Sequence, residues 1–188
     1  MGVESGVARE ELEALAARAK GGDAAAFDAL ATVVSGRLLA FARGTLRDTQ
    51  LAEEAVQEAL TRIYRFLDKY QQGSFLAWSM QIVRNACMDV AVREGKHRHL
   101  RVVAPDEDVA NPATSDGAGT IEARIRIEQA LATLTETHRT AFLLTVQGLR
   151  YEEIARICGV PVGTVRSRLF NARVQLRAQL NDLVEEDR

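Results

Sequence analysis

The sequence predicts an all-α protein made of two small helical domains. Its composition is rich in Ala, Leu, Glu and Arg, which favour helices, and it contains only 3 Pro and 5% aromatic residues. Apolar residues recur at every third or fourth position through most of the chain, which is the spacing of one buried helix face. With 47% hydrophobic and 27% charged residues among 188, the composition is that of a folded soluble protein and excludes wholesale disorder.

Four helices are expected in the first half of the chain, and together they predict one compact bundle. They span residues 10–19, 24–47, 51–66 and 75–93. Asp23 and Asp48 each offer a side-chain oxygen that caps the helix after it. A break at 68–74 separates the last two helices, because the run Gln71-Gln72-Gly73 does not sustain a helix.

A linker is expected between the two domains. The segment 94–119 has no helical periodicity and collects Pro, Gly, Asn, Ser and Thr. We therefore divide the chain into residues 1–95, a flexible linker at 96–119 and residues 120–188. Helices resume near Ile121, with breaks near 134–135, 147–148 and 159–161. The linker has too few apolar side chains to offset the entropy of ordering and is expected to be disordered.

The charge of the whole chain hides a local surplus of basic residues. Its 24 basic and 26 acidic residues give a net charge of −2, which shows no overall bias towards nucleic acid or membrane. Within residues 150–177, however, six arginines face only two glutamates. A second basic cluster surrounds the end of the fourth helix and consists of Arg84, Arg93, Lys96, His97, Arg98, His99 and Arg101.

Several classes of site and location are excluded by the sequence. Cys87 and Cys158 lie far apart within helical patterns, which predicts core residues rather than a disulfide or a metal-ligand pair. We find no catalytic constellation, no phosphate-binding glycine loop and no histidine with a ligand partner, so neither a metal nor another cofactor is expected. No apolar run reaches the length of a membrane span and residues 1–9 do not resemble a signal peptide, so we expect a cytoplasmic protein without membrane contact.

The residues 151–170 predict a helix-turn-helix. Ala155 is small where the two helices cross, Gly159 can take positive φ at the turn, and Pro161 suits the first turn of the second helix. An apolar stripe then runs along one side through Val162, Val165, Leu169, Ala172, Leu176, Leu180 and Leu183. The opposite side displays the candidate DNA-binding residues Gly163, Thr164, Arg166, Ser167, Phe170, Arg173 and Arg177. Arg and Ser can reach base edges and the remaining arginines can reach phosphates, although a helical hairpin with a solvated Arg face is the alternative.

The chain resembles a known family in both halves. Leu149 to Leu169 is similar to the −35-binding domain of bacterial RNA polymerase sigma factors of the extracytoplasmic-function (ECF) group. Residues 48–65, with Ala-Glu-Glu-Ala-Val-Gln-Glu-Ala inside them, resemble the helix by which these factors grip the β′ clamp helices of the polymerase. Residues 75–89 resemble the helix that opens the −10 element.

The resemblance implies roles for individual residues. The polymerase-binding residues would be Glu53, Glu54, Gln57 and Glu58, for which a solvated acidic face is the alternative. The residues that hold the −10 strand would be Lys69, Tyr70, Gln71, Gln72, Ser74, Trp78, Gln81, Arg84 and Asn85. In this set Trp78 is expected to pack rather than stack on a base. The loop 68–74 is short and glutamine-bearing where many relatives have a longer one, so the identity of the captured base stays open. Separately, Ser79 stands where relatives usually have an apolar residue.

The resemblance also implies a function and partners. The chain would be a sigma factor, not itself an enzyme, that binds the β′ and β subunits of core polymerase. It would recognise −35 DNA as duplex, open the −10 element, be held by an anti-sigma factor and be a monomer when free. Two alternatives remain: a stand-alone helix-turn-helix regulator with an N-terminal sensing domain, which would bind palindromic DNA as a dimer, and an adaptor that binds only protein.

Overall fold

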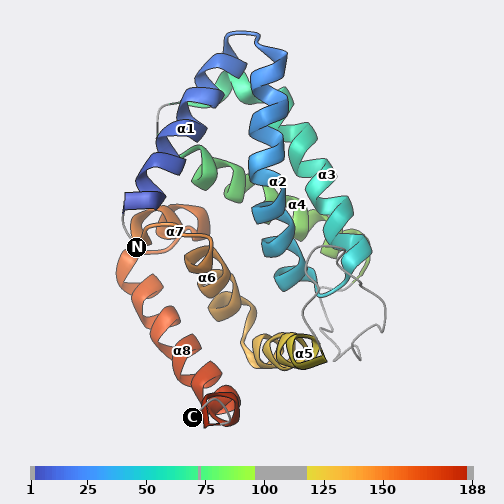
Figure 1. The fold of residues 1–188 in the computed structure, drawn as a ribbon, viewed down its shortest axis with the longest axis vertical. Helices are drawn as coiled ribbons and strands as arrows, with labels where there is room; N and C mark the ends of the chain where they lie inside the picture. Colours follow the sequence, from blue (N-terminus) through green and yellow to red (C-terminus); the bar gives the residue numbers. More distant parts are fainter. Residues whose placement is uncertain (1–2, 72, 96–117, 186–188) are drawn as a thin grey trace.

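The first half of the chain forms a bundle of four α-helices in the computed structural model, which describes residues 3–71, 73–95 and 118–185. Its elements are α1 (Val3–Lys20), α2 (Ala24–Leu46), α3 (Thr49–Arg65), the 3₁₀ turn η1 (Leu67–Lys69) and α4 (Phe75–Arg93). The described residues contain no strand, in agreement with the all-α prediction. In Figure 1, α2, α3 and α4 run close together, and α1 flanks them on one side.

Local capping fixes where these helices begin. The carboxylate of Asp23 accepts a hydrogen bond from the Ala26 amide at 3.0 Å, and that of Asp48 accepts one from the Leu51 amide at 3.0 Å, so both predicted caps are confirmed. The α4 helix has a similar cap that was not predicted, in which Ser74 Oγ accepts from the Ala77 amide at 3.1 Å. The first helix is longer than expected, because it begins at Val3 rather than at residue 10.

The second half contains the predicted helix-turn-helix. Its elements are α5 (Ala118–Thr133), α6 (Glu136–Val146), α7 (Tyr151–Cys158) and α8 (Val162–Glu185). Gly159 ends α7 in the left-handed conformation with φ 66°, as predicted. Pro161 precedes α8 instead of lying in its first turn, and its carbonyl oxygen accepts from the amides of Thr164 and Val165.

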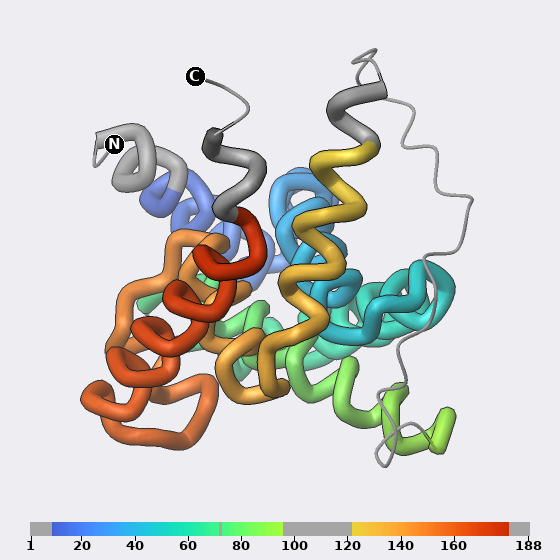
Figure 2. Tube along the Cα trace, turned by 90° about the horizontal axis from the view of Figure 1, so that it is seen from below, coloured from blue at the N-terminus to red at the C-terminus, as the bar shows by residue number. Residues whose placement is uncertain are grey.

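The helix-turn-helix core follows the predicted apolar stripe. Val165, Leu169, Ala172 and Leu176 are buried, and they pack against Ala130, Leu134, Leu144 and Ile154 of the neighbouring helices. In Figure 2, α5 (yellow) and α8 (red) run alongside each other. The exposed side of α8 is therefore held in a fixed orientation by helices on the opposite side.

The two halves pack against each other rather than lying apart. Helix α6 lies on α2 so closely that a Cβ atom on Gly44 would stand 2.8 Å from a methyl carbon of Leu143. On α1, the Arg9 guanidinium pairs at 2.9 Å with Glu153 of α7, whose side chain is only 5% exposed. One continuous cluster of buried apolar residues crosses this boundary. We call this packing the closed arrangement.

Residues 96–117 of the predicted linker lie outside the described residues. Its expected disorder is therefore not tested, and the division of the chain at 96–119 stays a prediction. Helix α5 begins at Ala118, slightly before the predicted end of the linker.

Helix α2 is long and apolar enough to cross a membrane by length and composition, contrary to the expectation that no segment reaches that length. Among the described helices it alone passes this test. A core helix of a soluble protein passes the same test, and α2 packs against α1, α3, α4 and α6 with Leu30, Val34, Leu38 and Phe41 buried. Its apolar composition is therefore explained by its central position in the bundle.

Candidate nucleic-acid interface

The exposed face of α8 is basic and unneutralised. Arg166, Arg173 and Arg177 are all exposed, and none of them forms an ion pair with a described residue. Ser167 is also exposed, and its hydroxyl donates to the Thr164 carbonyl at 3.0 Å. Phe170 is 67% exposed, as predicted from its place off the apolar stripe. These side chains share one surface that can approach a DNA groove with base-reading and phosphate-binding groups.

The start of α7 orients this helix pair. The Glu153 carboxylate accepts a hydrogen bond from the Arg150 amide at 2.9 Å, which satisfies a free donor at the helix N-terminus. The same carboxylate binds Arg9 of α1. Glu153 therefore both caps the first helix of the helix-turn-helix and ties it to the first half of the chain.

Hydrogen bonds of Tyr70 hold the loop between η1 and α4 in place. The Tyr70 hydroxyl donates to the Gly73 carbonyl at 2.7 Å, and Lys20 Nζ of α1 donates to the Tyr70 carbonyl at 2.7 Å. The Tyr70 ring is only 9% exposed and packs against Phe75 and Trp78 with ring centroids 5.2 and 5.4 Å away. Burial raises the pKa of Tyr70, with a smaller contribution from the charge of Glu13. Tyr70 thus shapes the loop, and its ring is not free to stack on a base.

A cavity of about 400 Å³ lies between this loop and α1. Its lining residues are Glu13, Ala17, Lys20, Tyr70, Gln71 and Gly73. The sequence did not predict that Glu13, Ala17 and Lys20 of α1 border this loop. Their spacing places them on one helix face, but no local pattern shows which loop that face meets.

The remaining candidates for the −10 strand fall into two groups. Gln81 and Asn85 lie one turn apart on α4 and are exposed, whereas Trp78 is half-buried against Phe75 and Tyr70. Ser74 caps α4, Lys69 Nζ lies 4.8 Å above the Phe66 ring, and Gln72 lies outside the described residues.

Arg84 faces the second half of the chain. Burial raises the pKa of the Cys158 thiol on α7, and the positive charges of Arg84 and Arg168 oppose that shift, so Arg84 lies near α7. Arg84 is half-buried, in contrast to the exposed Gln81 and Asn85 on the same helix.

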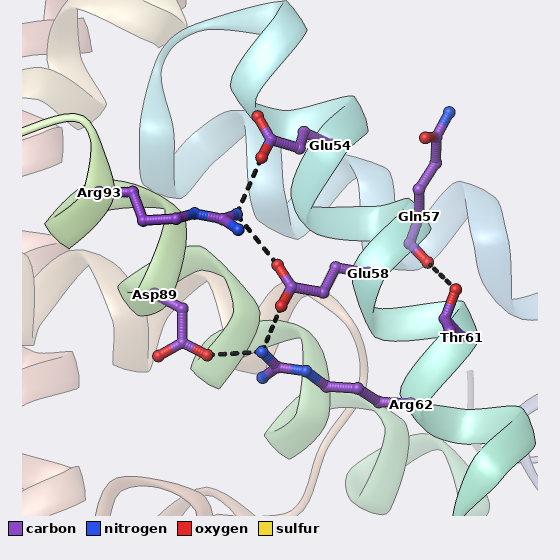
Figure 3. Close-up of polar contacts among 7 residues, drawn as sticks. All are labelled: Glu54, Gln57, Glu58, Thr61, Arg62, Asp89 and Arg93. Atoms are coloured by element: carbon purple, nitrogen blue, oxygen red, sulfur yellow. Dashed lines mark hydrogen bonds and ion pairs between the residues drawn. The ribbon is translucent and has the colours of Figure 1, made fainter.

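The acidic face of α3 is largely neutralised by the chain's own arginines (Figure 3). Arg93 of α4 binds Glu54 at 2.8 Å and Glu58 at 3.1 Å. Arg62 binds both Glu58 and, at 2.7 Å, Asp89 of α4.

This face is exposed at Glu53, Glu54 and Gln57, but its carboxylates are paired rather than free. The Glu58 side chain is 29% exposed, and Glu53 lies 3.5 Å from Arg43. In Figure 3 the amide of Gln57 points away from the ion-pair network, and it forms no hydrogen bond with a described residue. A partner would meet alternating Glu and Arg side chains rather than a row of free carboxylates.

The described residues show no group of side chains suited to a metal ion. Cys87 is buried, as predicted, and burial raises its pKa to about 12, so its thiol stays protonated near neutral pH. Cys158 is half-buried. Ser79, at the position where an apolar residue was expected, is fully buried and its hydroxyl donates to the Phe75 carbonyl at 2.9 Å.

Comparison with known protein families matches both halves of the chain. Residues 30–97 match Sigma-70 region 2, and residues 124–176 match Sigma-70, region 4. The chain is 32% identical to the RNA polymerase sigma-H factor of Pseudomonas aeruginosa over 95% of this chain and 98% of that protein. It is 31% identical to the ECF RNA polymerase sigma factor SigK of Mycobacterium tuberculosis, over 89% of this chain and 92% of that one. The chain belongs to the ECF group of RNA polymerase sigma factors.

Solved structures with a similar fold agree with this assignment. The sigma factor RpoE of Bartonella quintana, in complex with the anti-sigma factor NepR, is 28% identical with a TM-score of 0.68, covering 82% of this sigma factor and 96% of that chain. CnrH in complex with the cytosolic domain of CnrY has the same fold with a TM-score of 0.69 at 24% identity, covering 92% and 98% of the two chains. The region 2 match contains the cavity loop, α3 and α4, and the region 4 match contains most of the basic α8 face.

Proposed function

We propose that this sigma factor binds core RNA polymerase through α3, reads the −35 element as duplex through α8, and holds the −10 element as an opened strand. The exposed, unneutralised arginine face of α8 carries the −35 part of the proposal, because it joins base-reading and phosphate-binding side chains on one rigid helix. The roles of the individual residues rest on this geometry and on the family membership. The sigma factor works as a specificity subunit and is not itself an enzyme.

The cavity beside the 69–74 loop supports strand capture. Pulling a base from a duplex costs a few kcal/mol, which contacts available only to the unstacked base must offset. The cavity offers room for such contacts, and Gln81 and Asn85 are exposed on α4, the helix that follows the loop.

Strand capture is tested by separating the opening of DNA from its binding. With core polymerase and 2-aminopurine in the −10 element, Asn85→Ala should impair the opening of a closed promoter more than the binding of a pre-melted one. Equal losses on both templates would mean that Asn85 only supports the fold.

Promoter binding requires the closed arrangement to open. The −35 and −10 elements are centred about 25 base pairs apart, which is about 85 Å at a rise of about 3.4 Å per base pair. A compact chain of this length has a radius of gyration of about 16 Å, so the closed arrangement does not span both elements. The 22 residues 96–117 can reach about 75 Å when extended, which is enough to let the halves separate.

The partners follow from the same reading. We propose core polymerase, through its β′ clamp helices and β subunit, and promoter DNA as the productive partners. An anti-sigma factor is the proposed inhibitory partner. This proposal is supported by the similar structure of RpoE, which is bound to the anti-sigma factor NepR, and by that of CnrH, which is bound to the cytosolic domain of CnrY. Cytoplasmic location and a monomeric free state complete the proposal, and neither a metal nor a cofactor is invoked.

A further inference from the structure

An acidic side chain borders the cavity beside the 69–74 loop. Glu13 lies on the same face of α1 as Ala17 and Lys20, and the three line the cavity opposite the loop. Among the lining residues, Glu13 carries the only carboxylate. Burial raises the pKa of Tyr70 and the charge of Glu13 raises it further, which agrees with a carboxylate directed towards the loop.

Arg9 holds this carboxylate at one of its oxygens. Arg9 Nε donates to Glu13 Oε1 at 3.1 Å, one turn away on α1. The same guanidinium also donates to Glu153 of α7 at 2.9 Å in the closed arrangement. The contact between Arg9 and Glu13 is internal to α1, so it does not require the two halves to be in contact. Arg9 can therefore position Glu13 in the open arrangement as well.

The second oxygen of Glu13 is available to a ligand. Glu13 Oε2 accepts no hydrogen bond from a described residue, and the side chain is 36% exposed. An ionised carboxylate only accepts hydrogen bonds, so the group that meets it must be a donor.

Charge decides which part of an opened strand can face Glu13. A carboxylate repels phosphates, so a strand that enters the cavity must turn a base rather than its backbone towards Glu13. Lys20 lies two turns further along α1, and its Nζ donates to the Tyr70 carbonyl at 2.7 Å. An ammonium group has further donors, which can reach the sugar–phosphate backbone.

We propose that Glu13 reads the captured base and selects one with an exocyclic amino group, which is cytosine, adenine or guanine and not thymine. A carboxylate accepts a hydrogen bond from an amino group such as cytosine N4, whereas thymine presents the O4 carbonyl at that place. Thymine is rejected because the carboxylate would lose water without gaining a donor. This inference rests on the proposed function, since it requires that the cavity takes a base of the opened −10 strand.

The test uses holoenzyme, formed from core polymerase and the full chain, on a promoter found by run-off transcription. The −10 element is held unpaired, each non-template base in turn is replaced by the four bases, and affinity is measured by competition. At one position we expect thymine to bind about tenfold more weakly than the best base with an amino group. The ranking of cytosine, adenine and guanine at that position identifies the base that the cavity takes.

Glu13→Gln is the decisive variant, because the amide keeps the shape of the side chain and adds a donor that thymine O4 can accept. At the position that disfavours thymine, the penalty should fall to about threefold or less, and base preferences at the other positions should not change. Glu11→Gln is the matched control, because Glu11 is exposed on the other side of α1 and does not line the cavity.

Two results would overturn the role of Glu13 while strand capture stands. These are the absence of any position that disfavours thymine, and a thymine penalty that Glu13→Gln retains. An equal change of base preference in Glu11→Gln would also overturn it. Equal affinity for the pre-melted template and its duplex counterpart would instead overturn strand capture, and the role of Glu13 with it.

Discussion

Replacing Gly44 by Leu should separate the two halves without disturbing the first bundle. Already a Cβ atom at this position would stand 2.8 and 2.9 Å from the two methyl carbons of Leu143 and 3.4 Å from its Cγ, and these are the three atoms nearest to it. Overpacking of this kind costs about 1–3 kcal/mol. At about 1.4 kcal/mol per factor of ten, the closed arrangement should lose about 5- to 150-fold in population relative to the open one. Within α2 itself the substitution favours the helix by up to about 1 kcal/mol.

The separation can be measured by double electron–electron resonance. Spin labels at the exposed Gln50 of α3 and Gln175 of α8, in a chain without its two native cysteines, report the distance between the halves. Gly36→Leu is the control, because Gly36 lies on the same helix with no atom within 4 Å of its Cβ position. An unchanged distance distribution in Gly44→Leu, or an equal shift in the control, would refute the role of the Gly44 contact in closure.

Three further outcomes are expected. Glu58→Gln should lower the free energy of unfolding, measured in urea, by up to about 1 kcal/mol, because Glu58 links α3 to α4 through two arginines. Gln57→Ala should instead weaken the binding of core polymerase without changing the stability. Arg166→Ala should lose about 1–3 kcal/mol of discrimination between promoter sequences while Arg173→Ala weakens all sequences alike, as competition binding to −35 duplexes can show. The Cys87 thiol should resist alkylation in the native protein at pH 9 and react on unfolding, because burial raises its pKa to about 12.

The raised pKa of Cys87 also predicts how the stability of the fold depends on pH. The folded-state pKa is raised above the unfolded value, so the contribution of the neutral thiol is complete below about pH 9. It is lost as the pH rises from there towards about 12. A free energy of unfolding that increased over this range would contradict a buried, neutral thiol.

Local features of the fold were predictable because they depend on neighbouring residues. Asp23 and Asp48 signal their helix starts through a hydrogen bond that reaches only three residues along the chain. Gly159 ends α7 because the turn needs positive φ. The basic face of α8 could also be predicted, since a single helix determines which of its residues share a side.

Contacts between distant residues could not be predicted in this way. The neutralisation of Glu54 and Glu58 depends on Arg93, which lies 39 and 35 residues away and becomes their neighbour only when α4 packs on α3. The contact between Gly44 and Leu143 likewise joins the two predicted domains, so the closed arrangement has no sequence signal of its own. For the same reason Glu13 and Lys20 gave no sign that they border the 69–74 loop.

Run-off transcription with purified core polymerase tests the central claim most directly. Fragmented genomic DNA is transcribed with core enzyme alone, with core enzyme and this sigma factor, and with core enzyme and its Arg166→Ala variant. We predict discrete transcripts that appear only with the sigma factor and whose relative amounts change in the variant. If core enzyme gives the same products with and without the chain, the chain does not direct promoter-specific initiation.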